Sequence, residues 1–116
     1  MVVDDVSDLL AVIKMMLENQ GYRVHGFTNP KEALVHVKDG CTDCTVVLSD
    51  VRMPFMSGIE LVNHVKNLRP EMKIILMTAY NIEKEESQIV FPVDSFLNKP
   101  FTSPELIKAV ERACSN

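Results

Sequence analysis

The stretch TVVLSDVRMPFMSG, residues 45–58, indicates the fold of this chain. Its first half is a nearly continuous apolar run, which is typical of a parallel strand that helices cover on both faces. The run ends on Asp50, and Pro54 and Gly58 follow shortly after it. A carboxylate at the end of a buried strand costs free energy unless a cation, hydrogen bonds or a function compensates for it. Asp50 is therefore the first candidate functional residue.

The alternation of apolar strands and amphipathic helices continues on both sides of this stretch. Hydrophobic spacing predicts strands at 1–3, 22–27, 45–50, 73–79 and 94–99, and helices at 7–21, 28–40, 57–70, 81–90 and 102–114. This pattern predicts one α/β domain over residues 1–116, a doubly wound, three-layer (βα)5 arrangement with a five-stranded parallel sheet. The 81–90 helix is expected to be short or irregular, because it ends on the β-branched residues Ile89 and Val90 and Pro92 follows it.

The helix starts carry recognisable capping residues. Ser7 is the expected N-cap of the first helix, and Thr28 or Asn29 is the expected N-cap of the second, with Pro30 in its first turn. The first strand is short, since only Met1, Val2 and Val3 precede the acidic pair, and we expect the given sequence to begin inside that strand.

Composition narrows the classes of function. A net charge of −4 gives no electrostatic reason to expect nucleic-acid binding by this domain. No membrane span or signal peptide is recognisable, so a cytoplasmic location is expected. Cys41 and Cys44 form a lone CTDC that lacks a second pair of zinc ligands, so reduced thiols are expected. The three histidines lie on different predicted elements and are interpreted as structural or surface residues.

Polar side chains gather at one end of the predicted strands. In a doubly wound sheet, ligands bind beyond the carboxyl ends of the strands. The residues that follow or end the strands there are Asp4, Asp5, Asp50, Thr78 and Lys99. Three carboxylates, a hydroxyl and an ammonium are thus expected to converge on one edge.

This set of side chains favours phosphoryl chemistry. Clustered carboxylates need a cation at neutral pH, and oxygen ligands suit Mg²⁺ or Mn²⁺. Asp50 could then act as a nucleophile that forms an acyl phosphate, while Thr78 and Lys99 hold phosphoryl oxygens. Asp4 could instead serve only to cap the first helix.

The motifs VVDD (2–5), SDVRMPFMSG (49–58), MTAY (77–80) and FLNKPF (96–101) resemble the receiver domain of two-component response regulators over essentially the whole chain. The resemblance implies a flavodoxin-like strand order 2-1-3-4-5, and Asp50 as phosphoacceptor. It implies a magnesium site made by Asp4, Asp5, Asp50 and the backbone carbonyl of Arg52. It also implies catalytic roles for Thr78 and Lys99 and a cis peptide bond between Lys99 and Pro100.

The same resemblance implies a switch and a set of partners. Thr78 and Phe96 correspond to the residues that move on phosphorylation, and Phe96 is expected to be core in the resting state. The implied phosphodonor is a sensor histidine kinase or a phosphotransfer protein. A phosphorylation-dependent homodimer and an effector domain outside this chain are further expectations, with no membrane and no direct nucleic-acid contact.

Arg52 and Tyr80 depart from the usual pattern. They flank the expected path of the water that hydrolyses the acyl phosphate, so we predict a long-lived phosphoryl state; Arg52 could instead pair with a surface carboxylate. Other functions fit less well. Aspartyl-phosphate phosphatases need an acid where Arg52 stands, and a flavodoxin-like electron carrier needs a phosphate loop where DDVSDLL stands. A degenerate receiver that acts only as a docking or dimerisation module is the remaining alternative.

Overall fold

Five strands form one parallel sheet in the order β2-β1-β3-β4-β5, as predicted. The computed structural model describes residues 1–40, 44–78 and 92–115. The strands are β1 (Val2–Val3), β2 (Gly26–Phe27), β3 (Val46–Asp50), β4 (Lys73–Thr78) and β5 (Ser95–Asn98). The helices are α1 (Ser7–Glu18), α2 (Pro30–Lys38), α3 (Gly58–Leu68) and α5 (Ser103–Ser115). The helix expected at 81–90 lies outside the described residues.

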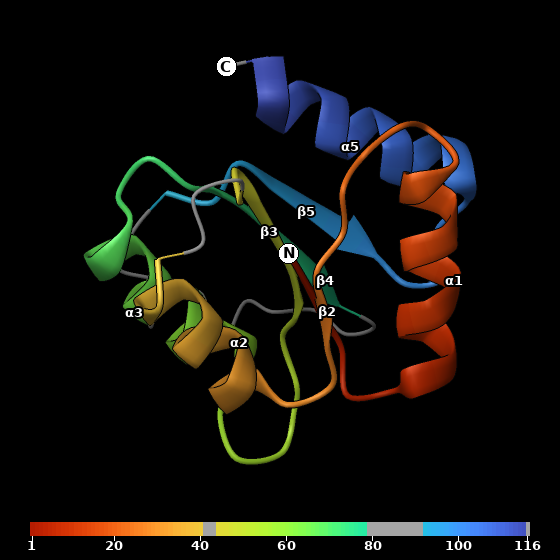
Figure 1. Ribbon diagram of the computed structural model, residues 1–116. Coiled ribbons are helices and arrows are strands. Elements are labelled where there is room, and N and C mark those ends of the chain that lie inside the picture. Colours follow the sequence, from red (N-terminus) through yellow and green to blue (C-terminus); the bar gives the residue numbers. More distant parts are fainter. Residues whose placement is uncertain (41–43, 79–91, 116) are drawn as a thin grey trace.

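Helices cover both faces of the sheet and produce the three predicted layers (Figure 1). Helices α1 and α5 lie on one face, and α2 and α3 lie on the other. Side chains alternate along the strands, so that Val47 packs with α2 and α3 while Leu48 packs with α1 and α5. Two apolar cores result, one on each side of the sheet. None of the helices in the described ranges is long and apolar enough to cross a membrane.

The capping residues are partly those expected. Asn29 accepts a hydrogen bond from the Lys31 N–H at 2.9 Å and caps α2. Ser7 is the first helical residue of α1 and not its N-cap, which is Val6. The reason is local: Asp4 Oδ1 accepts a hydrogen bond from the Val6 N–H at 2.9 Å, and this Asx-type turn leads into the helix.

Strand β2 is shorter than the predicted 22–27. Its partner β1 pairs only Val2 with Gly26 and Val3 with Phe27. Strand β2 lies at the edge of the sheet and pairs only with β1, so its length is limited to the residues that β1 can pair with. The other strands end together at one edge, since Asp50 pairs with Met77 and Thr78 pairs with Asn98.

Candidate functional site

The predicted polar residues of the described chain meet at the carboxyl edge of the sheet. Asp4 directly follows β1 and is fully buried, and Asp50 ends β3 with 9% of its surface exposed. Asp5 is exposed beside them. Carboxylate oxygens of these three residues all lie within 4.8 Å of one another. The structure thus forms a compact acidic cluster from two neighbouring strands.

Lys99 reaches into this cluster from the end of β5. Its Nζ atom lies 3.0 Å from Oδ2 of Asp4 and 3.2 Å from Oδ2 of Asp50. The backbone N–H of Lys99 donates a hydrogen bond to the carbonyl oxygen of Thr78 at 2.7 Å, and this bond holds the backbone of Lys99 against the end of β4. The Lys99–Pro100 peptide bond is cis, as the resemblance implied. Thr78 itself is buried at the end of β4.

Hydrogen bonds to backbone carbonyl oxygens fix the position of Asp50 and of the loop that follows β3. Ser49 Oγ donates to the Asp50 carbonyl oxygen at 2.9 Å, and the Gly58 N–H donates to the Val51 carbonyl oxygen at 2.7 Å. A Cβ atom added to Gly58 would lie 2.0 Å from the Asp50 carbonyl oxygen, so only glycine fits here. Phe55, at the outside of the same loop, has a positive φ of 73° and is 79% exposed.

The electrostatics of the site favour an additional cation. Burial raises the pKa of Asp50 above its ordinary value; Lys99 opposes the rise, and the charges of Asp4 and Asp5 add to it. Burial acts to lower the pKa of Lys99, but its hydrogen bonds and charge interactions with Asp4 and Asp50 outweigh burial and raise it. Lys99 is therefore charged at neutral pH, yet one ammonium does not balance three carboxylates.

The donor set fits a hard divalent cation. Carboxylate oxygens on two strands, with Asp5 open to solvent for water ligands, are the donors that Mg²⁺ and Mn²⁺ take in proteins. The fit rests on Asp4, Asp5 and Asp50. Arg52 is exposed in the loop, and the use of its carbonyl as a ligand stays a prediction.

Phe96 does not occupy the place expected for it. The sequence predicted a core residue in the resting state, but 42% of Phe96 is exposed. Alternation along β5 directs the buried Leu97 to the core beneath α1 and α5, so Phe96 faces the other side of an edge strand. Tyr80 lies outside the described residues.

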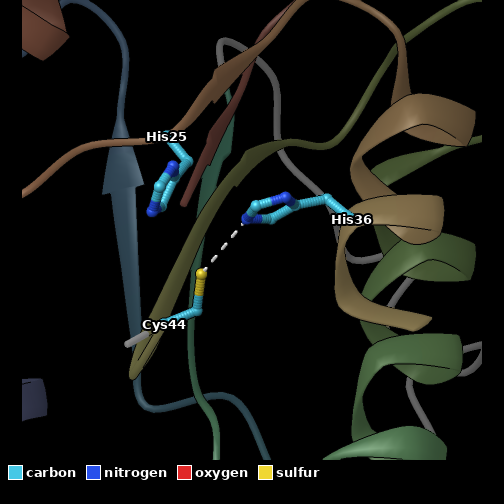
Figure 2. Close-up of side chains that lie close together, drawn as sticks. All are labelled: His25, His36 and Cys44. Carbon is cyan, nitrogen blue, oxygen red and sulfur yellow. Dashed lines mark hydrogen bonds between the residues drawn. The ribbon is translucent and has the colours of Figure 1, made fainter. Parts of the chain in front are cut away.

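A second cluster of polar side chains escaped the sequence analysis. His25, His36 and Cys44 present ring nitrogens and a sulfur that all lie within 4.8 Å of one another (Figure 2). Two of the three histidines are therefore neighbours, although they lie on different elements. Cys44 is disulfide-bonded and not a reduced thiol as expected, whereas Cys114 is free. Only a weak indication of this cluster is present in the sequence. His25 and Cys44 lie close to the amino ends of strands, and His36 lies in the last turn of a helix.

Comparison with known proteins places the sequence in a described family. A sequence model of the response regulator receiver domain matches residues 1–111. The DNA-binding transcriptional regulator NtrC of Salmonella typhimurium is 34% identical over 116 residues, which cover 99% of this chain and 24% of that protein. The response regulator SaeR of Staphylococcus epidermidis is 29% identical over 92% of this chain and 46% of its own length. The chain thus spans about a quarter of the length of the NtrC relatives it matches.

Solved structures agree with this placement. The receiver domain of NtrX from Brucella abortus superposes with a TM-score of 0.88 at 26% identity, covering 99% of this chain and 97% of that one. A response regulator receiver domain protein from Clostridium thermocellum gives a TM-score of 0.87 at 28% identity, covering 98% and 91% of the two chains.

Proposed function

The chain belongs to the response regulator receiver domain family, a family of signalling regulators in two-component systems, and we propose that it acts as a phosphorylation switch with Asp50 as the phosphoacceptor. The observation that carries this proposal is the pairing of one ammonium with two strand-end carboxylates. Lys99 Nζ contacts both Asp4 and Asp50 at the carboxyl edge, where ligands of doubly wound sheets bind.

The proposed step is a transfer of a phosphoryl group to Asp50. A carboxylate oxygen of Asp50 attacks the phosphorus of a phosphohistidine on the donor protein, and a P–O bond forms as the P–N bond breaks. The electron pair of the broken bond stays on the donor imidazole, which takes up a proton. The product is an acyl phosphate on Asp50.

Residues around Asp50 supply positioning and charge. Lys99, already 3.2 Å from Asp50, would pair with a phosphoryl oxygen, and the buried Thr78 hydroxyl would hold another. Asp4, Asp5 and Asp50 would hold Mg²⁺ or Mn²⁺, which when bound neutralises negative charge on the phosphoryl oxygens. The backbone carbonyl of Arg52 would complete the protein's share of the ligands.

The switch would run from Thr78 to Phe96. Movement of the Thr78 side chain toward the new phosphoryl group would vacate space behind it, and the exposed ring of Phe96 would turn inward to fill that space. The 42% exposure of Phe96 leaves apolar surface that this movement would bury. Phosphorylation would thereby change the surface of the domain near β4 and β5, and a partner would recognise that change.

The proposal includes specific partners. The donor would be a sensor histidine kinase or a phosphotransfer protein in the cytoplasm, and phosphorylation would favour a homodimer. The NtrC relatives are DNA-binding transcriptional regulators, so we propose that this receiver controls an effector domain of that general kind. A docking-only module is less favoured, because Asp4, Asp50, Thr78 and Lys99 are all in place.

Intact mass after incubation with acetyl phosphate and Mg²⁺ tests the proposal. One phosphoryl adduct per chain is expected for the native protein, and none for Asp50→Asn or when EDTA replaces Mg²⁺. Asp8→Asn, which changes an exposed aspartate on α1, is the matched control and should give the full adduct. A folded native protein that gains no adduct would favour the docking module instead.

A further inference from the structure

The cluster of His25, His36 and Cys44 lies at the edge of the sheet opposite to the acidic site. His25 directly precedes β2, and Cys44 lies two residues before β3, so both are at the amino ends of strands. Cys44 and Asp50 are six residues apart on one extended segment, which corresponds to about 20 Å. The cluster is therefore separate from the phosphorylation site proposed above.

The three side chains converge from three segments (Figure 2). His36 Nε2 lies 3.7 Å from Cys44 Sγ, and the ring of His25 lies beside the His36 ring, on the same side of the sulfur. The centroids of the two imidazoles are 4.7 Å apart, and the ring of Phe27 lies 5.2 Å from that of His36. Packing between His25 and Phe27 restrains the His36 ring with its Nε2 directed at the sulfur.

These distances approach those of a metal site. In a tetrahedral zinc site, bonds of about 2.3 Å to sulfur and about 2.0 Å to nitrogen hold the two donor atoms about 3.6 Å apart. The observed 3.7 Å between Cys44 Sγ and His36 Nε2 matches that separation, and the remaining pairs lie within 4.8 Å. Imidazole nitrogen and thiolate sulfur are ligands that zinc-like ions prefer and that Mg²⁺ does not.

We propose that His25, His36 and Cys44 form a binding site for a zinc-like divalent ion when Cys44 is reduced. A dithiol reductant would break the disulfide at Cys44: it supplies two electrons and two protons, both cysteine sulfurs become thiols, and the reductant becomes a disulfide. The ion then displaces the proton of the Cys44 thiol, and one water molecule completes four ligands. In the oxidised protein Cys44 has no thiolate to offer, so the site exists only in the reduced form.

The surroundings favour a cation at this position. His36 lies in the last turn of α2, whose carbonyl ends carry partial negative charge. Cys44 is buried, with 4% of its surface exposed, whereas both histidines are partly exposed and leave a route for the ion. A bound ion would tie β2, α2 and the start of β3 together on one face of the domain.

Titration with Co²⁺ tests the site without any substitution. The protein is kept in excess Mg²⁺, so that the acidic cluster is occupied, and Co²⁺ is added before and after reduction by a phosphine. One Co²⁺ per reduced chain with a thiolate-to-cobalt absorption band is expected, and no such band in the oxidised chain. A reduced protein with three titratable thiols and no band overturns the proposal.

Substitutions then assign the ligands. His25→Gln and His36→Gln are each expected to weaken Co²⁺ binding by at least about tenfold, whereas His64→Gln, on the exposed face of α3, is the matched control and should bind normally. Cys44→Ser should remove the thiolate band, while Cys41→Ser and Cys114→Ser should retain it. A band that survives in Cys44→Ser, or unchanged affinity in both histidine variants, would contradict the assignment.

Discussion

The backbone of Gly58 lies against the carbonyl oxygen of Asp50, where an added Cβ atom would come within 2.0 Å of that oxygen. The first residue of α3 is thereby fitted to the last residue of β3. We predict that Gly58→Ala lowers the free energy of unfolding by about 2 kcal/mol or more, because the backbone must move to admit the methyl group. Urea denaturation measures this change.

Gly26→Ala is a matched control for this prediction. A Cβ atom at Gly26 meets only the end of the Leu10 side chain, at 3.2 Å, and a side chain yields more easily than a backbone. We therefore expect a loss below about 1 kcal/mol. Equal losses in the two variants would show that the contact with Asp50 is not what excludes a side chain at Gly58.

Asp50 is expected to reduce the stability of the metal-free protein at neutral pH. Burial raises its pKa in the folded state, so folding favours the protonated carboxyl. That favourable contribution is complete below the unfolded pKa, near 3.9, and is lost as pH rises through the folded value. Asp50→Asn should therefore stabilise the protein at pH 7 by about 1 kcal/mol, the order of the penalty for a buried polar group that is incompletely paired.

Thermal unfolding in EDTA across pH tests this sign. The gain from Asp50→Asn should shrink as the pH falls and disappear near pH 3, where the wild-type carboxyl is protonated in both states. Asp8→Asn, at an exposed position, should show no comparable pH-dependent gain. A variant that is less stable than wild type at pH 7 without metal would mean that Lys99 more than compensates for the burial of Asp50.

Divalent cations should make the native chain more stable than Asp50→Asn, the reverse of the order expected in EDTA. An ion that binds only the folded state stabilises it by an amount that grows with the logarithm of the ion concentration, about 2.7 kcal/mol at one hundred times the dissociation constant. We expect Mg²⁺ to raise the melting temperature of the native chain by several degrees, and that of Asp50→Asn by much less. Equal shifts would place the ion elsewhere than at the acidic cluster.

Lys99 is expected to matter for stability as well as for signalling. Lys99→Ala leaves Asp4, which is fully buried, without its ammonium partner. Removal of one partner from a buried pair is costly, and because Lys99 is partly exposed we expect a loss of about 2 kcal/mol in EDTA. Mg²⁺ should restore part of that loss in equilibrium denaturation. Lys14→Ala, which changes an exposed lysine on α1, is the matched control and should cause no comparable loss in EDTA and no comparable recovery with Mg²⁺.

The lifetime of the acyl phosphate tests the roles proposed for Arg52 and Tyr80. Replacement by the smaller or acidic side chains in Arg52→Asn and Tyr80→Glu should open the path of the attacking water. We expect the phosphate to be lost about tenfold faster in the double variant, which corresponds to about 1.4 kcal/mol of barrier. The decay of the phosphoryl adduct by intact mass gives the rate, and an unchanged rate would end this idea.

The sheet and the acidic cluster were predictable because they follow from short-range patterns. The apolar run that ends on Asp50 marks a buried parallel strand, and the alternation of elements predicts right-handed crossovers. Those crossovers bring all the strand ends to one edge, so that Asp4, Asp50 and Lys99 meet although they are far apart in sequence. The separation of Lys99 from Asp4 by 95 residues was no obstacle.

Features that depend on tertiary detail were not predictable. The exposure of Phe96 depends on which face of an edge strand the neighbouring elements cover. The proximity of His25 to His36 depends on the rotation of α2 about its own axis, which places a residue of its last turn over β2. The length of β2 was limited by the two residues of β1, a property of the partner strand and not of the segment 22–27.

The ion pairs of Lys99 also bear on how the domain is made in a cell. Many small metal-binding domains are unfolded until their ion arrives, so that their assembly depends on ion supply. Here an internal ammonium already partners the two buried carboxylates, Asp4 and Asp50. The polypeptide can therefore fold without the cation that we propose for this site. Under that proposal, a change in magnesium concentration would alter how readily Asp50 is phosphorylated, whereas the chain would fold with or without the ion.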